Sequence, residues 1–179
     1  MKMIKTLASS GIITMALSVV FTTASLAQNP KLNDAEVASV AVTANQIDIN
    51  YAAVAKAKSK NADILKFAAT MSNDHKAVIA QAVALVTKLK VTPKDNAVSK
   101  KLMADAEVTK KALLSKSGKA FDKAYIDNEV AYHKAVIGAV EGLLIPSSKN
   151  AELKALLEKV VPALKVHLSH AEMVQMNFK

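Results

Sequence analysis

Residues 64–89, ILKFAATMSNDHKAVIAQAVALVTKL, decide the fold class, because their apolar residues recur alternately four and three positions apart. That spacing places the apolar side chains along one face of an α-helix, as in helices that pack side by side. One histidine, His75, interrupts this face near its middle. A polar group there must find a partner or destabilise the fold. The face, which we call the seam of the helix, is formed by Ile64, Ala68, Met71, His75, Val78, Ala82, Leu85 and Leu89.

Two later stretches have seams with the same spacing, and each also contains one histidine. The first of these seams is Ile126, Val130, His133, Ile137, Val140 and Leu144. The second is Leu153, Leu157, Val160, Leu164, His167, Ala171 and Val174. At a rise of about 1.5 Å per residue, each histidine falls within about one turn of the middle of its helix. In an antiparallel bundle the three imidazoles would therefore meet, which predicts one internal polar site.

The rest of the sequence also predicts helices. Glycine and proline are rare, with 4 residues of each. The expected helices cover about residues 34–59, 61–90, 96–115, 119–144 and 150–177, with turns at 91–95 and 145–148. Pro162 is expected to kink or restart the last helix, because it has no N–H to donate. Four long helices and one shorter one predict an all-α fold, an up-down four-helix bundle with one additional short helix.

The first 27 residues have the pattern of a signal peptide. Lys2 and Lys5 supply a basic start, residues 7–20 are mostly apolar or small, and Ser25-Leu26-Ala27 fits signal peptidase. We expect cleavage before Gln28 and export to the periplasm, with outer-membrane association or secretion as further destinations. Residues 28–179 are then expected to form a single helical-bundle domain without a transmembrane segment. The sequence has no cysteine, so packing rather than disulfides must stabilise that domain.

The charged residues argue against binding to nucleic acid. The chain has a formal net charge of +9, and all of its basic residues are lysines. Proteins that read nucleic acid rely on arginine for bidentate contacts and stacking. The lysines are scattered over several predicted helices rather than gathered in one patch. A solvated basic surface is the favoured interpretation, and an anionic envelope surface is the one candidate partner that this charge indicates.

The three seam histidines form a candidate metal site. Neutral imidazoles from three helices, completed by one carboxylate, suit one transition-metal ion such as Zn²⁺, Fe²⁺, Mn²⁺ or Cu²⁺. The predicted ligands are His75, His133 and His167. No thiol nucleophile, Gly-flanked serine, phosphate-binding loop or HExxH pattern is present, so catalysis by protein groups alone is not indicated. An enzyme with this sequence would depend on the metal.

Three further residues are candidates for a fourth ligand or for supporting a ligand. Asp48 falls at a similar depth in the first predicted helix, and Glu129 lies four residues before His133 on nearly the same face. His170 lies three residues after His167. Candidates for hydrogen bonds to the ligands are Asp74, Asp127, Tyr125 and Tyr132.

Other interpretations of the same residues stay open. The histidines could form a polar core network that fixes helix register in a non-catalytic structural or interaction protein of the periplasm or envelope. Clustered imidazoles could also act as a pH switch. His167, His170, Met173 and Met176 recur every third residue and offer copper ligands, although methionines that fill the core or cover a helix end are the favoured interpretation.

Several motifs extend over nearly all of the chain after residue 27. They are Ala44-Asn45-Gln46, Phe67-Ala68-x-x-Met71-x-x-Asp74-His75, Phe121-Asp122-x-x-Tyr125, Val130-x-x-His133 and Pro162-x-Leu164-x-x-His167-Leu168-x-x-Ala171. In their order and spacing the chain resembles an exported bacterial family, the domain of unknown function 4142, whose members are often labelled outer membrane proteins. The resemblance implies a ferritin-like fold. It implies no activity, because that family has no established biochemical role.

The sequence departs from the ligand pattern of ferritin-like di-iron proteins. Those bundles use Glu-x-x-His on two helices and a glutamate from each of the others. Here Ser72 stands three residues before His75, and Leu164 stands three before His167. The first helix carries Asp48 where a glutamate would be expected. These differences argue against a di-iron oxygen-activating enzyme.

Overall fold

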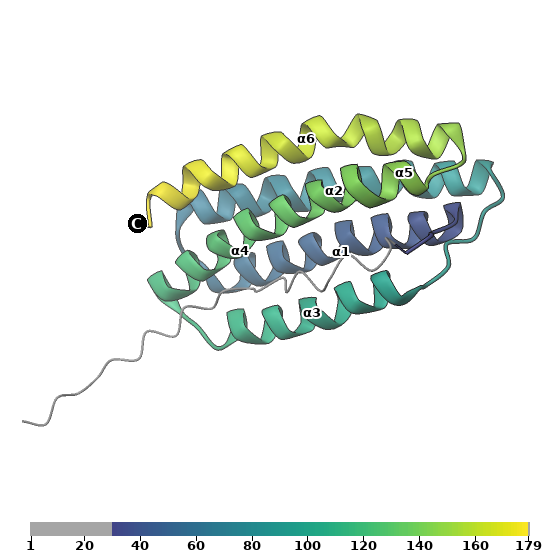
Figure 1. Cartoon of the computed structure of the whole chain (residues 1–179). Helices are drawn as coiled ribbons and strands as arrows, with labels where there is room; N and C mark the ends of the chain where they lie inside the picture. The colour runs from purple at the N-terminus through teal and green to yellow at the C-terminus, as the bar shows by residue number, and fades with distance from the viewer. Residues whose placement is uncertain (1–29, 179) are drawn as a thin grey trace, which may run out of the picture.

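The computed structural model describes residues 30–178, and these form helices joined by short connections (Figure 1). The predicted signal peptide lies outside the described residues. The elements are α1 (Asp34–Lys58), α2 (Ala62–Lys88), α3 (Ala97–Leu114), α4 (Gly118–Ala139), the π-helical turn η1 (Val140–Leu144), α5 (Ile145–Ser147) and α6 (Ala151–Met176). The described residues contain no strand, so the all-α prediction is confirmed. The ferritin-like relation of the bundle stays a prediction.

The long helices α1, α2, α4 and α6 run side by side along one axis (Figure 1). The most extensive helix–helix contacts are α1 against α2 and α4 against α6. The shorter α3 packs mainly on α1. No helix among residues 30–178 is long and apolar enough to cross a membrane.

Asparagine side chains set where four of the helices begin. Asn33 accepts a hydrogen bond from the Glu36 N–H, and the Glu36 carboxylate accepts one from the Asn33 N–H. Asn61, Asn96 and Asn150 likewise accept hydrogen bonds from the first-turn N–H groups of α2, α3 and α6. Each such cap stabilises its helix by about 1 kcal/mol. This is why the predicted starts of these helices lie within a residue or two of the observed ones.

The predicted turn at residues 145–148 is wrong in its extent, because the chain stays helical through Ser147. After α4 the helix widens into η1, where the Ile145 N–H bonds to the Val140 carbonyl oxygen. Pro146 then stands in the first turn of α5, a position that needs no N–H partner. Pro162 does not restart the last helix either, since α6 runs through it as one element.

The core consists of two apolar clusters with a polar layer between them. The first cluster includes Phe67, Phe121 and Tyr125. The second includes Val37, Val40, Val140, Leu144 and Leu157. On α4 the first cluster ends at Val130 and the second begins at Ile137, and on α6 the second includes Leu164 and the first includes Ala171. His133 and His167 fall in those intervals, so the helices carry the histidines to the boundary between the clusters.

Candidate metal centre

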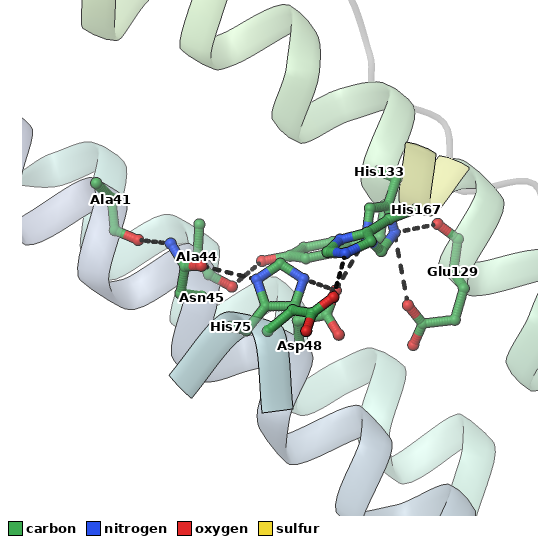
Figure 2. A network of polar contacts seen from close by, with 10 residues as sticks. Ala41, Ala44, Asn45, Asp48, His75, Glu129, His133 and His167 are labelled. Carbon is green, nitrogen blue, oxygen red and sulfur yellow. Dashed lines mark hydrogen bonds and ion pairs between the residues drawn. The ribbon is translucent and has the colours of Figure 1, made fainter. Parts of the chain in front are cut away.

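The three seam histidines meet in the interior, as their spacing predicts. Figure 2 shows their rings approaching one another from different helices. The ring centroids of His75 and His133 are 5.8 Å apart, those of His75 and His167 5.3 Å, and those of His133 and His167 5.7 Å. The three residues are 4%, 1% and 6% exposed, in sequence order. The rings therefore form a nearly equilateral, solvent-shielded triangle.

A hydrogen bond from the other ring nitrogen fixes the orientation of His75. Its Nδ1 lies 2.7 Å from Oδ1 of Asn45 on α1. The Asn45 side-chain N–H donates to the Ala41 carbonyl oxygen, so the amide oxygen is the atom that faces the ring (Figure 2). An amide oxygen only accepts, and Nδ1 of His75 must therefore carry the proton. Nε2 is left with its lone pair directed into the triangle.

The other two rings are oriented in the same way. Nδ1 of His133 donates to the Glu129 carbonyl oxygen at 2.9 Å, which leaves Nε2 as the lone-pair nitrogen. Nε2 of His167 donates to Oδ2 of Asp74 at 2.9 Å, which leaves Nδ1. Metal-binding histidines typically donate their second N–H to a carboxylate or carbonyl oxygen in this manner.

The three lone-pair nitrogens, Nε2 of His75, Nε2 of His133 and Nδ1 of His167, have no hydrogen-bond partner among the described residues. The ligand atoms of these three histidines lie within 4.8 Å of one another. Buried polar atoms are nearly always paired, and an unpaired one destabilises a fold by about 1–3 kcal/mol. A cation bound among the three rings would satisfy all of them.

Asp48 of α1 adds a carboxylate to this triangle. It is 1% exposed, and its Oδ2 lies 3.3 Å from Nε2 of His75 and 3.5 Å from Nε2 of His133. Neither contact has the alignment of a hydrogen bond, and both Asp48 oxygens are unpaired within residues 30–178. Burial raises the pKa of Asp48 from 3.8 to about 8. At neutral pH the carboxyl therefore keeps its proton unless a cation lies beside it.

Burial also controls the charge of the imidazoles. It lowers the pKa of His75 from 6.5 to about 3, and repulsion from His133 and His167 adds to this effect. It lowers the pKa of His133 to about 4, again with repulsion from His167, while the hydrogen bond to the Glu129 carbonyl oxygen acts in the opposite direction. Both rings are therefore neutral at pH 7, and the neutral form is the one that binds metals.

Glu129 lies beside the triangle and is fully buried. Its Oε2 is 3.6 Å from Nδ1 of His133. Ligand atoms of Asp48, Glu129 and His133 also lie within 4.8 Å of one another. Burial, reinforced by repulsion from Asp48, raises the pKa of Glu129 well above its usual value, although the neighbouring Tyr125 lowers it. The two carboxylates and His133 therefore form a second group of ligand atoms that adjoins the first.

A sequence model of the domain of unknown function 4142 matches residues 21–174, which include all of these residues. The chain belongs to this family. No curated protein and no solved structure matches the chain. The resemblance drawn from the sequence motifs is thus confirmed for the family.

In this DUF4142 chain the other predicted residues divide into two groups. Asp74 contacts a predicted ligand, because it accepts a hydrogen bond from His167. The Tyr132 hydroxyl donates instead to the Ala44 carbonyl oxygen at 2.9 Å. Asp127 instead accepts hydrogen bonds from Lys123 and Gln175.

In the DUF4142 chain, the C-terminal pattern of every third residue does not converge on the histidine triangle. Its members are His167, His170, Met173 and Met176. The His170 ring contacts the edge of Phe67, with centroids 5.2 Å apart, and belongs to neither group of ligand atoms. Met173 and Met176 are 53% and 59% exposed. Only His167 of that pattern reaches the triangle.

Sequence patterns indicate no role for Asn45, although this residue orients His75. Its signal in the DUF4142 sequence is an amide three residues before Asp48, on a helix whose inner face is mainly apolar. That signal becomes informative only when the relative rotation of α1 and α2 is known.

Proposed function

We propose that this DUF4142 protein is an exported metal-binding protein whose buried centre holds one transition-metal ion. The predicted ligands are His75, His133 and His167, with Asp48 as the fourth ligand and Glu129 beside it. The observation that carries the proposal is the orientation of the three rings. Each ring donates from one nitrogen to a protein oxygen, its other nitrogen is buried without a partner among the described residues, and ligand atoms of the three rings lie within 4.8 Å of one another.

The composition of the ligand group favours a divalent ion of the borderline class. Three imidazole nitrogens and one carboxylate oxygen fit Zn²⁺, and also Fe²⁺, Mn²⁺ and Cu²⁺. Metal–nitrogen bonds of about 2.0–2.1 Å would draw the rings closer together than they lie here.

The unpaired atoms also distinguish this proposal from a polar core network. A network that fixes helix register stabilises the fold only when its members are hydrogen-bonded to one another. Here the ring-to-Asp48 contacts lack that alignment, and both Asp48 oxygens are unpaired among the described residues. The geometry therefore supports a cation more strongly than an internal network.

The setting that we propose is metal handling or stress protection in the cell envelope. The support for export is the basic, apolar and Ser-Leu-Ala pattern of residues 1–27. The surface lysines and the net charge of +9 favour contact with anionic envelope material in the same compartment.

The experiment is metal analysis of untagged protein purified from a bacterial envelope fraction, by inductively coupled plasma mass spectrometry. The wild type is compared with a His75→Ala/His133→Ala variant and with His170→Ala. His170→Ala is the matched control, because it removes an imidazole that packs on Phe67 outside the triangle. We expect about one metal ion per chain in the wild type and the control, and none in the double variant.

Circular dichroism confirms that each variant is folded before its metal content is compared. If the double variant does not fold, Asp48→Asn replaces it, since that change removes the carboxylate while preserving shape. A folded wild type that takes up no stoichiometric metal after exposure to Zn²⁺, Fe²⁺, Mn²⁺ and Cu²⁺ would overturn the proposal.

A further inference from the structure

An apolar cavity of about 420 Å³ ends at the histidine triangle. Its volume lies within the range of about 300–1,000 Å³ that is common for small-molecule sites. Asn45, Asp48 and the three histidines belong to its wall. The rest of the wall is mainly aliphatic and comes from α1, α2, α3, α4, α6 and the η1 segment. The cavity thus has one strongly polar buried end and long apolar sides.

The cavity replaces the core along the second half of α2. All the buried residues of this helix lie between Ile64 and His75, and its residues after His75 are half-buried or exposed. The seam nevertheless continues past His75 through Val78 and Ala82, and both line the cavity. An apolar face of this length gains stability only when it is removed from water. At Val78 and Ala82 this face borders the cavity, whereas Leu85 farther along packs against the second apolar cluster.

The cavity is elongated along the bundle. On α2 its wall extends from His75 to Val86, about 16 Å along a regular helix. On α6 it extends from His167 back to Leu153. The exposed pair Lys101 and Asp105 on α3 belongs to the wall, so the cavity is open to solvent on that side. A ligand that fills this shape has a linear apolar body and a polar group at its buried end.

Charge at the buried end identifies the polar group. A divalent ion held by the three histidines and Asp48 would place a cation at the buried end of this cavity. A head group that balances a cation there is a monoanion with oxygen donors. Zn²⁺ and the other candidate ions, Fe²⁺, Mn²⁺ and Cu²⁺, readily bind such oxygens. We propose that the cavity binds a linear aliphatic monocarboxylate, whose tail lies along α2 and α6 and whose carboxylate reaches the metal centre. This inference rests on the proposed function.

The experiment uses zinc-loaded full-length protein and isothermal titration calorimetry with hexanoate, octanoate and decanoate. Each added CH₂ group that enters the cavity should tighten binding about fourfold, the change expected from removing it from water. Methyl decanoate, which lacks the charge, should bind at least tenfold more weakly than decanoate. Equal affinities for the three acids, or equal affinities for decanoate and its ester, would overturn the inference.

Two alanines of α2 provide a matched pair of variants. Ala82→Phe places a ring in the cavity, whereas Ala84→Phe places the same ring on the exposed face two residues away. We expect decanoate to bind at least tenfold more weakly to Ala82→Phe than to Ala84→Phe, while both keep their zinc. Val160→Phe repeats the test from α6 if Ala82→Phe does not fold.

The metal content of each sample separates the two proposals. Zinc at about one ion per chain without decanoate binding overturns this inference and leaves the proposed function intact. Folded protein that takes up no metal overturns the proposed function, and this inference falls with it, because the carboxylate then has no cation to meet.

Discussion

Oδ2 of Asp48 and Nε2 of His75 lie 3.3 Å apart in the interior of the bundle, and neither atom has a hydrogen-bond partner within residues 30–178. In water such a pair would ionise as a carboxylate and an imidazolium. Here burial raises the pKa of Asp48 to about 8 and lowers that of His75 to about 3. The proton therefore stays on the carboxyl group, and the pair is neutral at pH 7. A cation that binds between them must displace that proton.

The first prediction is that metal affinity depends on pH through Asp48 rather than through His75 or His133. The pKa values of His75 and His133, about 3 and 4, leave these rings neutral throughout the neutral range. Because Asp48 titrates near 8, the affinity for Zn²⁺ should rise about tenfold per pH unit between pH 6 and 8. Competition with a fluorescent chelator measures this slope. Asp48→Asn should bind more weakly and with a flatter profile, whereas a wild-type affinity that levels off by pH 6.5 would contradict the assignment.

The second prediction concerns the stability of the metal-free protein. The lowered pKa values of His75 and His133 give stability that is present above pH 6.5 and is lost as the pH falls toward 4 and 3. The raised pKa of Asp48 gives stability that is present below pH 3.8 and is lost as the pH rises to about 8. The two effects oppose each other between about pH 4 and 6.5. Above pH 6.5 the raised pKa values of Asp48 and Glu129 both act in the same direction, so stability should fall.

Urea denaturation in the presence of a chelator measures this fall. The free energy of unfolding should fall by on the order of 1 kcal/mol per pH unit, because folded Asp48 retains a proton that the unfolded chain has lost. Asp48→Asn, which has no proton to lose at this position, serves as the control and should remove the part of the decrease that belongs to Asp48. Stability that instead rises from pH 6.5 to 8 in the wild type would show that Asp48 is ionised in the folded metal-free protein.

The third prediction is that Asp74 strengthens metal binding without touching the metal. Its carboxylate holds the N–H of His167 and directs the opposite nitrogen into the triangle. Such supporting hydrogen bonds contribute about 10–100-fold in affinity. Asp74→Ala should weaken Zn²⁺ binding by about this factor. Asp127→Ala is the control, since that carboxylate accepts hydrogen bonds from Lys123 and Gln175. Equal losses in both variants would point to a general change of charge rather than to orientation of His167.

The fourth prediction is that the metal stabilises the fold. A ligand present at 100 times its Kd stabilises the folded state by about 2.7 kcal/mol. The Tm of the wild type and of His170→Ala should therefore rise with Zn²⁺ and return to its starting value with excess chelator. The His75→Ala/His133→Ala variant should melt at one temperature with or without Zn²⁺. A rise of equal size in that variant would assign the stabilisation to a surface site.

The sequence predicted the fold class and the meeting of the histidines, because both follow from local patterns. The alternation of four and three residues places each histidine on the inner face of its helix, and asparagine caps such as Asn61 determine where the helices begin. Because every α-helix rises by the same distance per residue, the three rings then lie at a similar depth along the bundle. None of these inferences requires knowledge of a contact between distant residues.

What the sequence did not predict depends on rotation and packing between helices. The contact of Asn45 with His75 requires a particular rotation of α1 against α2. The seam of α2 has the same spacing on both sides of His75, yet one side packs in the core and the other lines a cavity. Periodicity reports which face is apolar, but it does not report whether protein or empty space lies opposite. His170 was a candidate ligand because it is close to His167 in sequence, and its ring lies against Phe67 instead.

The order of the helices along the chain has a consequence for when the centre can capture its ion. His75, His133 and His167 belong to α2, α4 and α6, and Asp48 belongs to α1. The ligand set is therefore complete only after the last helix has docked. A chain that is still being synthesised or translocated offers no more than part of it. Under the proposed function, the ion would be selected where folding finishes, from whichever metals that compartment supplies at that moment.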